Sequence, residues 1–229
     1  MLDVFFDKWW RVGGVAGILF IIVFIVGIVL QGEAPAFDDP VDEIRDWFAD
    51  NGEQYLVGHY LIVLGFVLFF LPFLSSLRGI LARAEGDPAV WSWVTFLGGV
   101  LIIIVGAVAG MFWATLAYGY GIRSDGDEAT IRTLMHLDLA AFSTLPMVFI
   151  PFVLGTSIVI LRTGVFWRWL PIIGLIVAVF SAIGGASLLT SDHAGALGGV
   201  GAIGFIGAPI WILLLSVNMI LKSEAPAAA

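Results

Sequence analysis

Six long apolar stretches run through the sequence, and they constrain the fold more than any other feature. They cover about 12–31, 55–77, 94–118, 134–161, 169–189 and 197–221. Each has about 20 residues or more, which is the length an α-helix needs to cross about 30 Å of hydrocarbon. Because 60% of the residues are hydrophobic and only 12% are charged, a water-soluble fold could not bury this much apolar surface. The sequence therefore predicts a single all-α transmembrane domain over residues 1–229, with six transmembrane helices.

The distribution of Lys and Arg predicts the orientation, because cytoplasmic loops of membrane proteins carry an excess of these residues. With the N-terminus inside, seven of the ten basic residues face the cytoplasm and the other three face outward. The inner group is Lys8, Arg11, Arg78, Arg83, Arg162, Arg168 and Lys222, and the outer group is Arg45, Arg123 and Arg132. We therefore expect both termini to lie in the cytoplasm.

The first outer loop has an amphipathic segment of its own. Val41, Ile44, Trp47 and Phe48 fall on one face of a helix, and the pair at 51–52, Asn-Gly, is a typical helix stop. This pattern predicts a short amphipathic helix on the outer interface. Packing as a cap on the bundle is favoured over docking of a partner.

Small residues recur inside the spans. Gly13 and Gly17 are four residues apart, as are Gly106 and Gly110. The last span has glycines spaced by three, at Gly195, Gly198, Gly201, Gly204 and Gly207. Since lipid is as apolar as leucine, close approach of helices is what holds a membrane bundle together. These glycines predict tight packing within the chain, with a subunit interface or a path for a substrate as alternatives.

Five ionisable residues are candidates for chemistry. His59, His136 and Asp138 lie near the outer ends of spans, and Asp192 and His193 lie in the short outer turn before the last span. All three histidines of the chain therefore fall at the outer end of the predicted bundle. An ionisable side chain inside a span is costly and is a functional candidate by default.

Three functional hypotheses follow from these histidines. A metal site would use His59, His136 and His193 as ligands, with Asp138 or Asp192 as a ligand or base, and would suit a zinc-bound water. Haem held between His59 and His136 is the second hypothesis, and a proton-responsive site is the third. The structural alternative is that these groups are hydrated and hydrogen-bonded at the headgroup boundary.

Other functional classes are disfavoured by composition and by missing motifs. The chain has no cysteine, which excludes disulfides, thiolate metal sites and a cysteine nucleophile. It lacks the G-x-S-x-G, phosphate-loop and H-E-x-x-H patterns. A formal net charge of −8 argues against binding to nucleic acid through a basic face.

Several stretches together resemble a broad family of uncharacterised bacterial integral membrane proteins with six helices. They are DDPVDEIRDWFADNGEQYLVGHYL, FFLPFLSSLRGILARAEGDPAVW and LMHLDLAAFSTLPMVFIPFVLGTSIVILRTGVFWRWLPIIGLIVAV. The usual P-R-W-L of that family is Trp167-Arg168-Trp169-Leu170 in this chain. The resemblance implies a six-helix bundle and transfers no catalytic residue, because no activity is assigned to the family.

The function expected from the sequence is non-enzymatic. We expect a multi-pass protein of a bacterial cytoplasmic membrane that assembles with itself or with a membrane partner, or that passes a small solute, and that holds no cofactor. The alternative is an outer-face membrane enzyme, dependent on zinc or haem and built on His59, His136 and His193, with Asp138 beside them.

Overall fold

The computed structural model describes residues 2–36, 39–119, 127–189 and 196–222, and within these ranges the chain is helical without a strand. Six helical stretches are long and apolar enough to cross a membrane. They are Trp9–Gln31, Val41–Glu85, Val90–Gly119, Glu128–Thr163, Leu170–Leu189 and Ala196–Lys222. Each coincides with one predicted span, so the prediction of an all-α polytopic membrane protein is confirmed.

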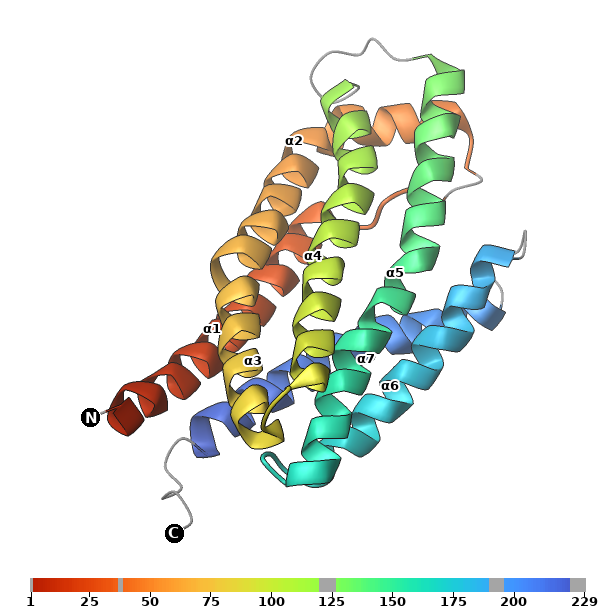
Figure 1. Ribbon diagram of the computed structural model, residues 1–229. Helices are drawn as coiled ribbons and strands as arrows, with labels where there is room; N and C mark the ends of the chain where they lie inside the picture. The colour runs from red at the N-terminus through yellow and green to blue at the C-terminus, as the bar shows by residue number, and fades with distance from the viewer. Residues whose placement is uncertain (1, 37–38, 120–126, 190–195, 223–229) are drawn as a thin grey trace.

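The helices follow one another up and down the bundle (Figure 1). In chain order they are α1 (Leu2–Gln31), α2 (Val41–Gly65), the π-helix η1 (Phe66–Phe70), α3 (Leu71–Glu85), α4 (Val90–Leu116), α5 (Glu128–Thr163), α6 (Leu170–Gly185), the 3-10 helix η3 (Ala186–Leu189) and α7 (Ala196–Lys222). The start of α1 and the end of α7 lie at the same end of the bundle, where a Cβ placed on Gly14 would meet the Ile220 side chain. This arrangement fits an even number of crossings, and which end faces the cytoplasm stays a prediction.

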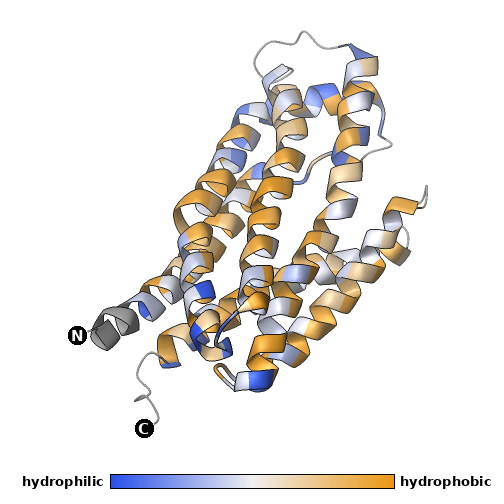
Figure 2. Cartoon of the chain, viewed as in Figure 1, coloured by the Kyte–Doolittle hydropathy of each residue, from blue (hydrophilic) through white to orange (hydrophobic). Residues whose placement is uncertain are grey.

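The outer surface of the bundle is apolar over most of the length of the helices. Figure 2 shows hydrophobic residues along the helices and hydrophilic ones gathered toward their ends. Large side chains such as Val29 (69% exposed), Ile206 (60%) and Met111 (59%) stand free of the interior. In water such exposure would be unfavourable over so many residues, whereas lipid tails solvate these side chains well.

The amphipathic segment of the first outer loop forms the beginning of α2, which crosses the top of the bundle before the helix descends (Figure 1). Val41, Ile44 and Phe48 are buried there and pack in one cluster with Leu116 and Ile131. Its apolar face therefore lies on the ends of α4 and α5, as the predicted cap on the bundle requires.

The predicted helix stop in this segment is wrong, because α2 continues without interruption to Gly65. The Asn51 amide donates to the Trp47 carbonyl one turn earlier at 2.9 Å, and Gly52 is buried inside the helix. Contacts with the rest of the bundle thus override a local signal that would otherwise favour an end.

Glycines bring several helices into close contact, as the spacing of Gly201 and Gly204 in the last span predicts. A Cβ placed on Gly184 in α6 would overlap the backbone of Gly201 in α7, and one placed on Gly204 would lie 2.7 Å from the Ser181 hydroxyl. On the other side of the bundle, a Cβ on Gly58 in α2 would lie 2.6 Å from the carbonyl oxygen of Gly27 in α1. Close packing within one chain is therefore the role of these glycines.

Prolines coincide with irregular stretches of two helices. The π-helix η1 lies just before Pro72, which has no N–H to offer the preceding turn. Pro146 and Pro151 lie inside α5, which remains helical and changes direction between its upper and lower halves (Figure 1).

Candidate functional site

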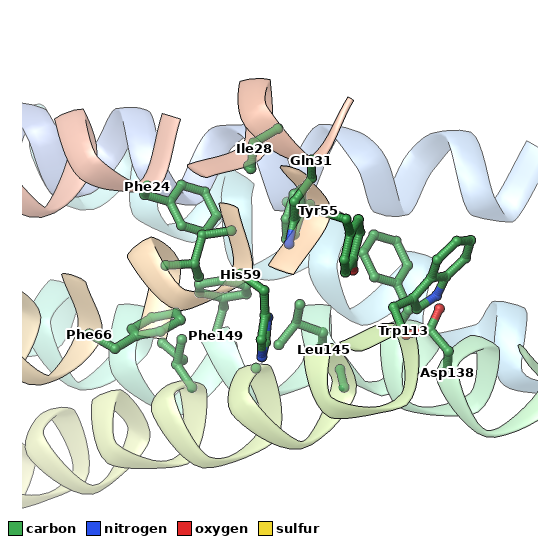
Figure 3. Close-up of a pocket in the computed structure, with 17 residues that line it drawn as sticks. Phe24, Ile28, Gln31, Tyr55, His59, Phe66, Trp113, Asp138, Leu145 and Phe149 are labelled. Atoms are coloured by element: carbon green, nitrogen blue, oxygen red, sulfur yellow. The ribbon is translucent and has the colours of Figure 1, made fainter. Parts of the chain in front are cut away.

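A cavity of about 360 Å³ lies between α1, α2, α4 and α5, in the half of the bundle nearer the cap. One residue of α7, Phe205, also lines it. Figure 3 shows side chains from several elements pointing into it. Two of the polar residues singled out in the sequence, His59 and Asp138, line this cavity.

The polar lining consists of five side chains. They are Gln31 at the end of α1, Tyr55 and His59 in α2, Trp113 in α4 and Asp138 in α5. The Trp113 indole donates a hydrogen bond to the Asp138 carboxylate, and Figure 3 shows the indole nitrogen pointing toward that group. Tyr55 is almost fully buried, with only 7% of its surface exposed.

The remaining lining is apolar and includes five phenylalanines. Phe24, Phe66, Phe149 and Phe205 contribute rings from α1, η1, α5 and α7. The ring centroids of Phe24 and Phe66 are 6.3 Å apart in an edge-to-face arrangement, and those of Phe24 and Phe205 are 6.5 Å apart. The cavity is therefore lined partly by aromatic rings and partly by polar side chains.

His59 occupies a position set by the adjacent helix α4. A Cβ built on Gly110 would overlap the His59 ring, with Nδ1 at 2.6 Å and Nε2 at 3.3 Å from it. Gly106, one turn earlier, faces the Phe66 ring at 3.5 Å. The two glycines thus give the rings of α2 and η1 room against α4.

The lining residues follow helical spacing along each element. On α2 and η1 they are Tyr55, His59, Ile62 and Phe66, and on α5 they are Asp138, Phe142, Leu145 and Phe149. Both sets are spaced i, i+4, i+7 and i+11, which places them on one face of a helix. This shared spacing is the sequence signal that could have identified the site, since it puts polar residues near the start of the same face on two different spans, with Tyr55 and His59 on one and Asp138 on the other.

The structure brings two of the predicted site residues together and separates a third from them. His59 and Asp138 line the same cavity. His136 is exposed, does not line the cavity, and has its Nδ1 2.6 Å from the Arg132 carbonyl of its own helix. His193, like the neighbouring residue 192, lies outside the described residues.

The metal and haem hypotheses stay predictions. In the part of the chain that the structure describes, no three His, Asp or Glu side chains lie close enough together to hold a metal ion. His59 with Asp138 would supply two ligands from one cavity, and a third would have to come from elsewhere.

Tyr55, Gln31 and Trp113 are site residues that the sequence interpretation missed, because near a span boundary such side chains are typical of interfacial anchors.

Comparison of the chain with models of known protein families, with curated protein sequences and with solved structures finds no match. The resemblance to uncharacterised six-helix bacterial membrane proteins therefore stays a prediction. Function has to be argued from the site itself.

Proposed function

We propose that this integral membrane protein is a non-enzymatic binding protein that takes a small lipophilic molecule with one polar end into the cavity between α1, α2, α4 and α5. Among the functions expected from the sequence, the passage of a small solute is the one most similar to this proposal, because both require a site for a small molecule. The observation that carries the proposal is the pairing of polar and aromatic surfaces within one cavity.

The size and chemistry of the cavity support this class of ligand. Its volume of about 360 Å³ lies at the lower end of the range found for small-molecule sites, about 300–1,000 Å³. Such sites are mostly apolar, with a few polar groups that fix the orientation of the ligand. Here the aromatic rings would contact the lipophilic body, and Tyr55, His59 and Asp138 would hydrogen-bond its polar end.

The charged residues around the cavity restrict the charge that the polar end of the ligand can carry. Among the described residues that line it, Asp138 supplies the one carboxylate and there is no Lys or Arg. An anionic head would meet this carboxylate without a compensating cation in a region of low dielectric. The proposal therefore specifies a neutral or cationic polar end.

The test is photolabelling of the purified full-length protein in lipid nanodiscs with a diazirine-bearing decanol. We expect labelled peptides from the cavity faces of α2, α4 and α5. Gly106→Leu should reduce this labelling, because Gly106 lines the cavity and the new side chain would occupy part of it. A Cβ at this position lies 3.5 Å from the Phe66 ring, which is an ordinary van der Waals contact, so the helix can accept the substitution. Gly199→Leu is the matched control, since Gly199 is exposed on α7 and its Cβ position faces open space.

Three outcomes would overturn the proposal. Labelling that is confined to lipid-facing residues, or that is unchanged in Gly106→Leu, would place the probe outside the cavity. Stronger labelling by a diazirine-bearing decanoic acid would contradict the role given to Asp138. Bound zinc or a Soret band in the purified protein would favour the metal- or haem-dependent enzyme instead.

A further inference from the structure

A second cavity lies at the opposite end of the bundle, between the start of α1 and α3. Its volume is about 570 Å³, and Trp9, Trp10, Ser76, Arg78 and Arg83 are among the residues that line it. α1 packs against α3, and Figure 1 shows both helices in this half of the bundle. This cavity is independent of the one assigned above, since the two share no lining residue.

Arg78 is held in place by an aromatic ring. Its guanidinium carbon lies 3.8 Å from the centroid of the Trp93 ring in α4, which is within the range of a cation–π interaction. Its Nε is buried and has no hydrogen-bond partner in the described parts of the chain. The side chain as a whole is only half-buried and lines the cavity, so the rest of its planar guanidinium can donate to a phosphate oxygen.

The acidic residue of α3 is engaged elsewhere. Glu85 accepts hydrogen bonds from the backbone N–H groups of Trp91 and Ser92, each at 2.9 Å, and from the Ser92 hydroxyl at 2.6 Å. These bonds hold its carboxylate at the start of α4. Glu85 is the only acidic residue of α3, so α3 offers no carboxylate to the cavity at Arg78.

The position of this cavity indicates a lipid rather than a soluble anion. Tryptophans at the end of a membrane bundle are typical of the headgroup region. Exposed apolar side chains lie on the same two elements, with Val12 (49% exposed) and Val15 (47%) on α1 and Leu71 (39%) on α3. A phosphate bound at Arg78 would therefore have hydrocarbon-facing surface next to it for acyl chains.

We propose that the cavity formed by Trp9, Trp10, Ser76 and Arg78 binds the headgroup of an anionic phospholipid, with its phosphate on the Arg78 guanidinium. Basic pockets between transmembrane helices are the physical type of site that recognises such headgroups. The site lies at the end of the bundle that the Lys and Arg distribution assigns to the cytoplasm.

Gly79 provides a way to block this site without removing its charge. It lines the cavity, and a Cβ placed on it meets nothing within 4 Å. Gly79→Leu should therefore fit the helix and fill the cavity. Arg78→Gln removes the charge, and Arg45→Gln is the matched control because it removes one positive charge at the opposite end.

The experiment measures the thermal unfolding of the full-length protein in a neutral detergent against added short-chain lipids. Dioctanoyl phosphatidylglycerol should raise the melting temperature of the wild type and of Arg45→Gln at lower concentrations than dioctanoyl phosphatidylcholine does. Arg78→Gln should need about tenfold more of the anionic lipid, as expected for the loss of one charged hydrogen bond. Gly79→Leu should raise the required concentration at least as much, because the added side chain occupies the space of the headgroup.

The remaining outcomes overturn the proposal. An unchanged lipid response in Gly79→Leu would show that the cavity is not used, even if Arg78→Gln fails to fold. Equal responses to the two lipids would remove the role of the anionic headgroup. Equal stabilisation by inorganic phosphate or glycerol 3-phosphate would indicate a site for a free phosphate and not for a lipid.

Discussion

Gly110 is the position at which α4 leaves room for the His59 imidazole, and this contact gives a sharp prediction. A Cβ on Gly110 would overlap the ring. Gly110→Ala should therefore destabilise the protein, and the same substitution should become favourable when the ring is removed by His59→Ala.

The expected magnitude follows from two opposing contributions. Forcing a methyl group into a packed position costs about 1–3 kcal/mol, and replacing glycine by alanine inside a helix gains about 1 kcal/mol. Gly110→Ala should thus lower the free energy of unfolding of the wild type by about 0–2 kcal/mol. In the His59→Ala background only the gain remains, so the coupling energy of the double-mutant cycle is the overpacking cost of about 1–3 kcal/mol.

The assay is reversible unfolding of the four proteins of the cycle in mixed detergent micelles, followed by far-ultraviolet circular dichroism. Gly199→Ala, at a position that faces open space, is the control and should have the same effect in both backgrounds. A coupling energy below about 0.5 kcal/mol, the usual limit of additivity for independent sites, would refute the contact between Gly110 and His59.

Three further predictions concern two helix N-termini and the loop between α3 and α4. Glu85→Ala should lower the free energy of unfolding by about 1–2 kcal/mol, because the backbone N–H groups of Trp91 and Ser92 lose their acceptor. An unchanged free energy of unfolding in chemical denaturation would contradict this. Hydrogen bonds from the Thr130 hydroxyl and N–H hold the pKa of Asp127 below its ordinary value. Its stabilising contribution is therefore complete above the ordinary pKa and is lost as the pH falls through the lowered one. Asp127→Asn should flatten this acid-side loss in unfolding curves measured from about pH 5 downward, and an unaltered pH dependence would count against the cap. A cysteine replacing Asp87 in this cysteine-free chain should react with an impermeant maleimide in inverted vesicles and not on intact cells; labelling of intact cells would reverse the predicted orientation.

The sequence predicted the spans well because their signal is additive over about 20 residues. It was less successful at the beginning of α2, where one local pair of residues indicated an end. Asn51 and Gly52 are typical of helix ends in isolation. The burial of Gly52 and of Phe48 against α4 and α5 is a tertiary contact, which no local pattern contains.

The candidate site was predicted in part for a similar reason. His59 and Asp138 stood out because an ionisable group in a span is rare, and both line the cavity. The sequence grouped His59 with His136 because all three histidines fall at the same end of the predicted bundle. The helix turns about 200° between His136 and Asp138, and His136 is accordingly exposed while Asp138 lines the cavity.

The glycines show most clearly why sequence spacing alone cannot separate packing from a binding site. Gly58 and Gly184 bring two backbones together, as small residues in membrane helices are expected to do. Gly106 and Gly110 have the same four-residue spacing as Gly13 and Gly17, yet they face the rings of Phe66 and His59 and lie in the wall of a cavity. A ring neighbour alone does not distinguish the two roles, because a Cβ placed on Gly17 would lie 2.8 Å from the Phe73 ring, and Gly17 is not among the residues that line the cavity. A glycine therefore indicates a cavity only where the rings that it faces also border unfilled space, as those of His59 and Phe66 do, and this depends on the tertiary packing.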